Sequence, residues 1–227
     1  MFANRRATAS GRAYVFYGGS MSSANASTAD VIMTGVGTSA YFGGALTVGD
    51  YNADGKDDLA VGSYRYDSFS GRVYVFYNAT LSGSISASSA DVILSGEASS
   101  DDNLGTTLAT GDFDRDGVDD LAVGAWRSDT FTGDVYLFYG DNLHTSDAID
   151  SGVKISGEAT NSNFGISLAA GDVSGDGVDD LVIGAHGYDD SSNEGRVYII
   201  MSEAATRAQG SFKQQGELLL RGNIKFE

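Results

Sequence analysis

The sequence has 227 residues, with 14 Lys and Arg against 31 Asp and Glu and a formal net charge of -17. It contains no Cys, which excludes disulfides, thiolate zinc sites, iron–sulfur clusters and cysteine nucleophiles. The acidic charge argues against nucleic-acid binding, which needs a basic surface, and no apolar run approaches the roughly 18 residues that a membrane span requires.

Short segments rich in Val, Ile, Leu, Tyr and Phe recur along the chain, bounded by Gly, Asp, Asn or Ser, and this pattern predicts β-strands. No long segment has a helical period, so we expect little helix beyond one short turn within 202–215. In chain order, the expected strands are 11–17, 29–33, 42–50, 58–62, 71–77, 90–94, 104–112, 120–124, 133–139, 152–155, 164–172, 180–184, 195–201 and 217–220.

These strands repeat as a set of four. The segment GRAYVFY at 11–17 returns as GRVYVFY, GDVYLFY and GRVYIIM, at spacings of 60, 62 and 62 residues. The segment is apolar without alternation, as expected of a strand buried on both faces. Short strands with both faces buried suit sheets stacked radially as propeller blades. A β-sandwich is the alternative, but it needs no such internal period.

We therefore predict an all-β fold, a β-propeller built of four-stranded antiparallel blades, in which 1–227 form a single propeller segment. If the strand before each acidic loop is the first of a blade, the chain supplies three complete blades and the outer half of a fourth. Such a set closes a ring poorly, so we expect self-association or further repeats to complete it. The repeat units cover about 11–70, 71–132, 133–194 and, in part, 195–227.

The same nine-residue acidic loop, D-x-[DNS]-x-D-G-x-x-D, occurs three times between the first and second strands of a blade. Side-chain oxygens at positions 1, 3 and 5 can converge on one point, and Gly at position 6 permits the sharp turn. The carbonyl of position 7 and the Asp at position 9 can complete the shell. Hard oxygen ligands of this kind suit Ca²⁺. The predicted ligands are Asp50, Asn52, Asp54, Lys56, Asp58, Asp112, Asp114, Asp116, Val118, Asp120, Asp172, Ser174, Asp176, Val178 and Asp180.

Charge supports metal binding, since the three loops carry -11 of the net charge and the other residues only -6. We expect three calcium ions, bound most tightly by the second loop, where positions 1, 3 and 5 are all Asp. The Asp at position 8 is expected to point away from the ion, as an outer or solvent-facing acid. The alternative interpretation of each Asp-Gly pair is a plain hairpin turn.

These motifs resemble the FG-GAP repeat of the integrin α-subunit β-propeller. The dipeptides at 42–43 and 164–165 match its first half, 104–105 is a softened copy, and the calcium loops fall between the two halves as in that family. The Pro that should end the second half is replaced by Tyr64, Trp126 and His186. Integrin propellers have seven blades, so this chain covers about half of one. The resemblance implies a calcium-binding, cell-adhesion propeller.

The loops between the second and third strands of each blade lie at the opposite end from the acidic loops. They carry Tyr64, Arg65, Tyr66, Trp126, Arg127, His186 and Tyr188, and aromatic and Arg residues are enriched in binding hot spots. In integrins this face engages the ligand and the partner subunit, so these residues are candidate ligand contacts. The alternative is that the aromatic side chains cover their own blades.

The sequence offers few of the side-chain arrangements that catalysis commonly uses. The two histidines, His144 and His186, fall at opposite ends of a blade, and we expect no enzyme. The predicted function is a calcium-binding interaction or cell-adhesion module that binds a protein ligand. The alternative is a carbohydrate-recognition or accessory module of a secreted enzyme, and a structural spacer is a third interpretation. We expect an extracellular or cell-surface location, with any signal peptide lost upstream, because weak calcium loops suit millimolar Ca²⁺.

Overall fold

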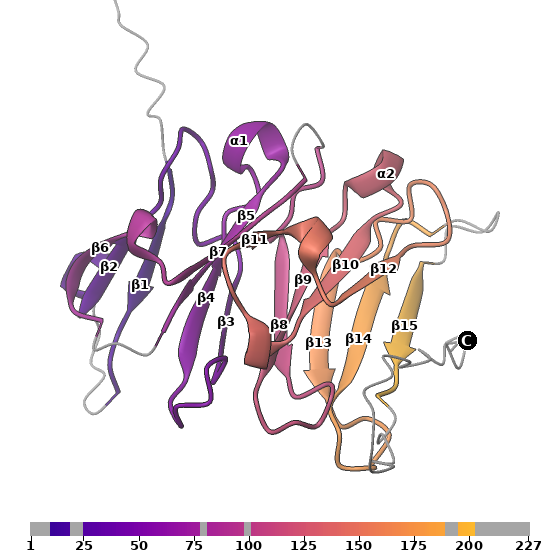
Figure 1. The fold of residues 1–227 in the computed structure, drawn as a ribbon. Coiled ribbons are helices and arrows are strands. Elements are labelled where there is room, and N and C mark those ends of the chain that lie inside the picture. Colours follow the sequence, from indigo (N-terminus) through magenta and orange to yellow (C-terminus); the bar gives the residue numbers. More distant parts are fainter. Residues whose placement is uncertain (1–9, 19–24, 78–80, 98–100, 189–194, 203–227) are drawn as a thin grey trace, which may run out of the picture.

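The computed structural model describes residues 10–18, 25–77, 81–97, 101–188 and 195–202. These residues form four sheets, numbered here as blades 1 to 4 (Figure 1). Blade 1 consists of β1 (Arg12–Val15), β2 (Val31–Thr34) and β6 (Gly83–Ser86). Blade 2 consists of β3 (Leu46–Gly49), β4 (Asp58–Gly62), β5 (Arg72–Phe76), β7 (Val92–Ser95) and β11 (Ser146–Asp147). Blade 3 consists of β8 (Thr107–Gly111), β9 (Asp120–Ala125), β10 (Asp134–Phe138) and β12 (Val153–Ser156), and blade 4 of β13 (Ser167–Gly171), β14 (Asp180–Ala185) and β15 (Arg196–Ile200).

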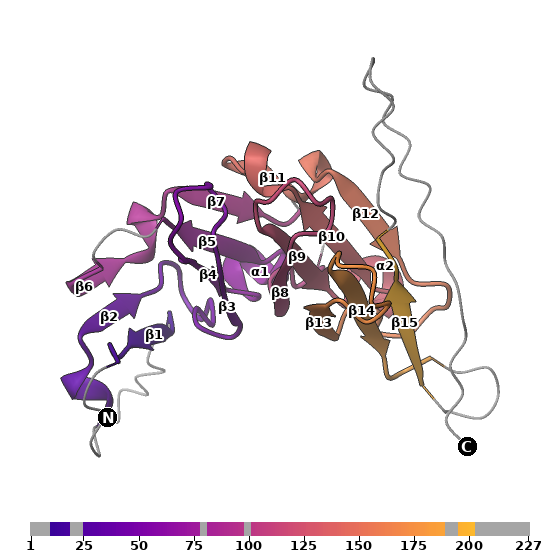
Figure 2. The same ribbon diagram turned by 90° about the horizontal axis from the view of Figure 1, so that it is seen from below.

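Successive blades lie side by side along an arc, with β3, β8 and β13 on its concave side (Figure 2). Strands that follow one another within a blade pair antiparallel, from β3 to β7 and from β8 to β12. The predicted all-β propeller architecture is confirmed, and the sheets do not form the two layers of a sandwich. The predicted strand at 217–220 and most of the turn at 202–215 lie outside the described residues.

The hydrophobic core lies between the blades. Val73 and Val75 on β5 belong to a cluster shared with blade 3, whereas Tyr74 and Phe76 belong to a cluster shared with blade 1. Neighbouring side chains of a strand point to opposite faces, so this strand packs against both neighbours. That explains why its sequence is apolar without alternation. A third cluster joins blade 3 to blade 4 in the same way.

Two strands were not predicted from the sequence. β6 lies in the connection between β5 and β7 of blade 2, but it pairs in parallel with β2 of blade 1. In the same way, β11 leaves blade 3 and pairs in parallel with β7 of blade 2. Each connection therefore covers the outer edge of the preceding blade, which removes an unpaired strand edge and interlocks the two sheets.

The remaining elements are single turns. Two four-residue turns, α1 (Tyr66–Phe69) and α2 (Ser128–Phe131), follow β4 and β9. The 3-10 turns η1 (Ala26–Thr28), η2 (Ala87–Ser89), η3 (Gly140–Asn142) and η4 (Ala148–Asp150) lie in the connections to the outer strands. Because the strands are antiparallel, α1 and α2 lie at the opposite end of the blades from the three acidic loops (Figure 1).

Candidate functional site

The acidic loops are named loop 1 (50–58), loop 2 (112–120) and loop 3 (172–180). In loop 2, carboxylate oxygens of Asp112, Asp114 and Asp116 lie within 4.8 Å of one another. The backbone holds these side chains in place. Asp112 accepts hydrogen bonds from the amides of Asp116 at 3.1 Å and Gly117 at 3.0 Å, and Asp116 accepts one from Val118 at 2.8 Å. Positions 1, 3 and 5 therefore converge as the sequence pattern predicted.

The electrostatics of loop 2 favour a cation. Partial burial raises the pKa of Asp114, and the charges of Asp116 and Asp112 raise it further. Burial also raises the pKa of Asp120 to about 7, with Asp114 and Asp116 again adding to the effect. These carboxylates destabilise one another's charge, and a bound cation would remove that cost. Three clustered carboxylates are hard oxygen donors, so the residues present fit a divalent ion such as Ca²⁺.

Loop 1 repeats this geometry with one substitution. Asp50 accepts hydrogen bonds from the amides of Asp54 at 3.0 Å and Gly55 at 2.8 Å. Asn52 stands where loop 2 has Asp114, and its side-chain oxygen accepts a bond from Asp54 at 3.0 Å. The same hydrogen-bond pattern is thus built with one charge fewer.

Loop 3 has Ser174 at position 3, and its backbone differs accordingly. Asp172 accepts bonds from the amides of Gly175 at 2.6 Å, Asp176 at 3.1 Å and Gly177 at 2.9 Å. These bonds, that from Gly177 first, lower the pKa of Asp172. The serine hydroxyl lies 3.5 Å from Asp172, so it is turned towards the first ligand position.

The Asp at position 9 is buried in all three loops. Asp120 is 1% exposed and accepts hydrogen bonds from the amides of Phe113 at 2.9 Å and Gly140 at 3.0 Å. Asp58 and Asp180 accept equivalent bonds from the residue at position 2 of their own loops. This Asp therefore ties the loop to its blade. The cluster of Asp112, Asp114 and Asp116 does not include Asp120. Direct ligation by Asp120 therefore remains a prediction.

The residues at position 7 are Lys56, Val118 and Val178. Their amides donate to the position-5 carboxylates of Asp54, Asp116 and Asp176 at 3.1, 2.8 and 2.9 Å. This bond fixes the peptide next to each predicted carbonyl ligand. Direct ligation by the three carbonyls is still a prediction.

At the opposite end of the blades, α1 borders a pocket of about 420 Å³. Three of the residues around it come from the loop before β3, and the others belong to α1 or precede it. The lining residues are Gly37, Thr38, Ser39, Arg65, Tyr66, Asp67, Ser68 and Phe69. The structure therefore places two of the predicted ligand residues, Arg65 and Tyr66, at a concave site.

Arginine and aromatic side chains alternate across the same end of blades 2 and 3. The Arg65 guanidinium lies 4.7 Å from the ring centres of both Tyr41 and Phe69. Arg127 continues the row, 5.2 Å from the rings of both Phe69 and Phe131. This stack joins the loops of neighbouring blades, and two predicted ligand residues hold it together.

Three of the four remaining predicted contacts are engaged within their own blades. Tyr64 packs on Tyr41 with ring centres 5.4 Å apart, and Trp126 packs on Phe131 at 5.6 Å. The ring centre of Tyr188 lies 3.6 Å from the Arg196 guanidinium. His186, in the same loop, is exposed. The aromatic side chains therefore do cover their blades, although they also border the surface at this end.

Sequence reasoning missed the strained backbone of these loops. Asp67, Ser68 and Phe69 have φ of 46°, 58° and 77°, and Asp129, Thr130 and Phe131 repeat the pattern at 45°, 59° and 63°. Left-handed conformations are unfavourable for side chains other than Gly, and they gather at functional sites. Asp tolerates them best, but nothing in the two sequences signals the left-handed Phe. The same left-handed turn occurs in blades 2 and 3, so it is a repeated structural feature of this end of the blades.

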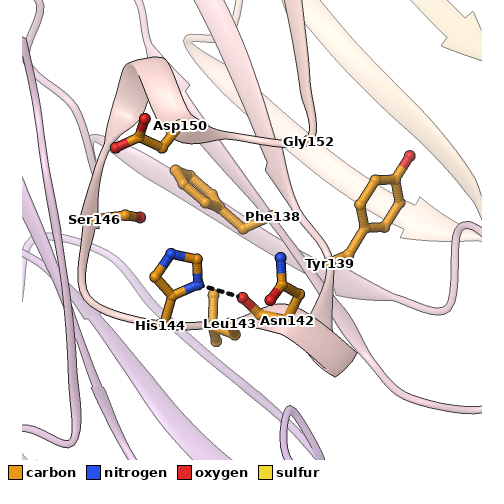
Figure 3. A pocket seen from close by; sticks show the side chains of 8 residues that line it. All are labelled: Phe138, Tyr139, Asn142, Leu143, His144, Ser146, Asp150 and Gly152. Atoms are coloured by element: carbon orange, nitrogen blue, oxygen red, sulfur yellow. Dashed lines mark hydrogen bonds between the residues drawn. The ribbon is translucent and has the colours of Figure 1, made fainter. Parts of the chain in front are cut away.

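A second, smaller pocket of about 70 Å³ lies beside η3 and β10 at the acidic end of blade 3 (Figure 3). His144 borders it, with its Nδ1 2.6 Å from the carbonyl oxygen of Asn142, and Ser146 and Asp150 also line it. His186 follows β14, at the opposite end of the strands. The two histidines therefore lie at opposite ends of the strands, as predicted.

Comparison with known proteins agrees with the fold. The FG-GAP repeat family matches residues 42–76, 104–138 and 164–200. The chain is 36% identical to phosphatidylinositol-glycan-specific phospholipase D of Bos taurus over 158 residues, which are 63% of this chain and 18% of that protein. It is 36% identical to integrin alpha-PS2 of Drosophila melanogaster over 118 residues, 49% of this chain and 8% of that protein. It is 32% identical to human integrin alpha-IIb over 199 residues, 81% of this chain and 17% of that protein.

The chain therefore spans less than a fifth of each of these relatives. Within the residues that the structure describes, no helix is long and apolar enough to cross a membrane.

Proposed function

Because the chain carries three FG-GAP repeats in an integrin-like propeller, we propose that it is a calcium-binding interaction module of the cell-adhesion type. Each of the three acidic loops holds one calcium ion, and the opposite face binds a protein ligand. The observation that carries the metal part is the convergence of Asp112, Asp114 and Asp116 within 4.8 Å. Bound calcium would offset two of these three negative charges and fix the loop.

The protein ligand is assigned to the end of the blades that carries α1 and α2. A pocket of about 420 Å³ lies there beside Arg65 and Tyr66, and a row of Arg and aromatic side chains borders it. Stacked aromatic and Arg side chains are rigid anchors that lose little entropy on binding. The left-handed backbone of α1 presents them in a fixed geometry.

The proposed ligand face is tested by a substitution that obstructs the pocket beside α1 and leaves the row of Arg and aromatic side chains unchanged. Thr38 is exposed and lines the pocket, so Thr38→Lys obstructs it, whereas Ser84→Lys adds the same side chain to exposed β6 on the outer edge. Both variants and the wild type are screened for saturable binding on arrays of purified secreted proteins and of glycans. We expect the wild type to bind a protein on the array, and added sugars should not affect this binding. Its affinity should be at least about tenfold lower in Thr38→Lys alone, as for loss of a central interface contact. Equal binding by the two variants would refute this placement.

A second candidate is a carbohydrate-recognition or accessory module of a secreted enzyme. Similarity to phosphatidylinositol-glycan-specific phospholipase D favours it, because this chain matches only 18% of that enzyme. Glycan binding that disappears with Trp126→Ala would support this candidate. In either case we propose no catalytic activity for the chain itself.

We further propose an extracellular or cell-surface location and completion of the ring by further repeats or a second copy. Leu46 and Val48 on β3 are 53% and 55% exposed. In blade 3 the equivalent face of β8 carries Leu108, which packs into the core shared with blade 2. Leu46 and Val48 thus present an apolar face where a preceding inner strand would pack.

A further inference from the structure

In loops 2 and 3, the Asp at position 8 contacts the loop of the preceding blade. The carboxylate of Asp119, in loop 2, accepts a hydrogen bond of 2.8 Å from the backbone amide of Asp50, in loop 1. The amide of Asp119 in turn donates to the carbonyl oxygen of Asp50 at 3.1 Å. Both backbone groups of the first residue of loop 1 are therefore held by one residue of the next blade.

The next pair of blades repeats the contact. The carboxylate of Asp179, in loop 3, accepts a bond of 3.2 Å from the amide of Asp112, in loop 2. Both Asp119 and Asp179 are partly buried, whereas Asp57 at position 8 of loop 1 is exposed. Asp119 and Asp179 therefore contact the preceding loop instead of facing only solvent, and their orientation away from their own ions stays a prediction.

An independent feature shows that the chain makes room for this contact. A Cβ added to Gly49, the residue before loop 1, would lie 2.4 Å from Cγ2 of Thr110 and 2.8 Å from the carboxylate of Asp119. A Cβ added to Gly111, before loop 2, would lie 2.9 Å from the carboxylate of Asp179. Any side chain at these positions would crowd the acid, so Gly before the loop leaves room for the Asp at position 8 of the next blade.

We propose that Asp119 and Asp179 are positioning residues for the calcium site of the preceding blade. This inference rests on the proposed calcium binding. Asp50 and Asp112 stand at position 1 of their loops, where the side chain is the first predicted ligand and its orientation follows from its backbone. Holding that backbone from the next blade reduces the reorganisation needed when the ion binds. Each of these two calcium sites is therefore built by two blades rather than by its own loop alone.

Charge alone is a competing explanation, because any acid near a loop attracts a cation. Two matched variants separate the effects. Asp119→Ala removes both the charge and the acceptor, and Asp119→Asn removes the charge but keeps a carbonyl acceptor for the amide of Asp50. Asp57→Ala removes the same charge at position 8 of loop 1, where the described residues show no such contact.

The experiment titrates the full chain with CaCl₂ and follows the amide signals of Gly55, Gly117 and Gly177 by two-dimensional NMR, so that each loop reports separately. We expect Asp119→Ala to weaken the calcium affinity of loop 1, read at Gly55, by about tenfold. In Asp119→Asn and Asp57→Ala the affinity at Gly55 should stay within about twofold of the wild type, as expected when no buried hydrogen bond is lost.

The outcomes distinguish this inference from the proposed function. If the wild type shows calcium-dependent shifts and Asp119→Ala titrates like it at Gly55, the positioning role is wrong while calcium binding stands. An equal loss in Asp119→Ala and Asp119→Asn would assign the effect to charge and also overturn it. If no glycine signal of the wild type shifts at millimolar calcium, both proposals fail. Retained signal dispersion checks that each variant is folded.

Discussion

When the residue that opens the third strand of a blade differs between repeats, its partner in the preceding loop differs as well. Arg72 opens β5 and stacks on Tyr66 at 3.8 Å, and Arg196 opens β15 and stacks on Tyr188 at 3.6 Å. In blade 3 the strand opens with Asp134 instead, and the matching loop residue is Ser128, whose hydroxyl donates to Asp134. The charge is also balanced locally, because Lys154 lies 3.0 Å from the Asp134 carboxylate.

This pairing means that Tyr66 stabilises its own blade as well as bordering the pocket. Replacing Tyr66 by Leu removes the aromatic face under Arg72 and should lower the free energy of unfolding by about 1 kcal/mol. Tyr66→Phe keeps the face and should stay within a few tenths of the wild type. Urea unfolding followed by fluorescence measures both. Equal losses in the two variants would mean that the hydroxyl, rather than the ring, matters.

At the scale of elements, neighbouring blades are joined where the third strand of one blade begins, next to the first residues of the following repeat. Gly71 precedes β5, has φ of +84° and forms a parallel bridge with Leu104, the first residue of the second FG-GAP match. A Cβ on Gly71 would lie 2.2 Å from the carbonyl oxygen of Leu104. Gly11 and Gly133 face Phe42 and Phe164 in the same way. The first half of the repeat motif therefore docks on the backbone of the preceding blade.

Gly71→Ala combines an unfavourable φ with a clash against backbone, and it should destabilise the protein by at least about 3 kcal/mol. Gly83 is the matched control, since its φ is +66° but a Cβ there would meet no atom within 4 Å. Gly83→Ala should cost only about 1 kcal/mol, the price of the left-handed conformation. Differential scanning calorimetry of the two variants compares them, and similar losses would contradict the close approach between blades.

At the scale of the whole molecule, the two proposed sites lie at opposite ends of the strands. The acidic loops gather at one end and the stacked aromatic loops at the other, with the inter-blade core between them (Figure 1). The loops are also tied across blades, through Asp119 and through the hydroxyl of Tyr51, which lies 2.6 Å from Thr110 of blade 3. Calcium at one end should therefore stabilise the association of the blades themselves.

Addition of 10 mM calcium to chelator-treated protein should raise the melting temperature by about 5 °C or more. An ion bound only by the folded state with an affinity of 10⁻⁴ to 10⁻³ M contributes roughly 1.4 to 2.7 kcal/mol at that concentration. Magnesium at the same concentration should raise it less, because its rigid octahedral shell fits flexible loops poorly. Melting curves that do not respond to calcium would contradict the proposed sites.

Much of the fold could be read from the sequence because the propeller repeats local information. The apolar strands, the 60- to 62-residue spacing and the acidic loops are all contained within one repeat. Positions 1, 3 and 5 of loop 2 converge because Gly117 and the local amides turn the chain, and this needs no distant residue. The sequence by itself thus determined the blades and the candidate ligands.

Only the tertiary structure decided what crosses between blades. β6 and β11 form strands because the preceding blade offers an open edge, and their own sequences carry no strong strand pattern. Asp119 contacts Asp50 across 69 positions of sequence, and the row through Arg65 and Arg127 joins two repeats. Such contacts depend on how one sheet is placed against the next. That placement is set by packing over the whole inter-blade surface, which no single repeat encodes.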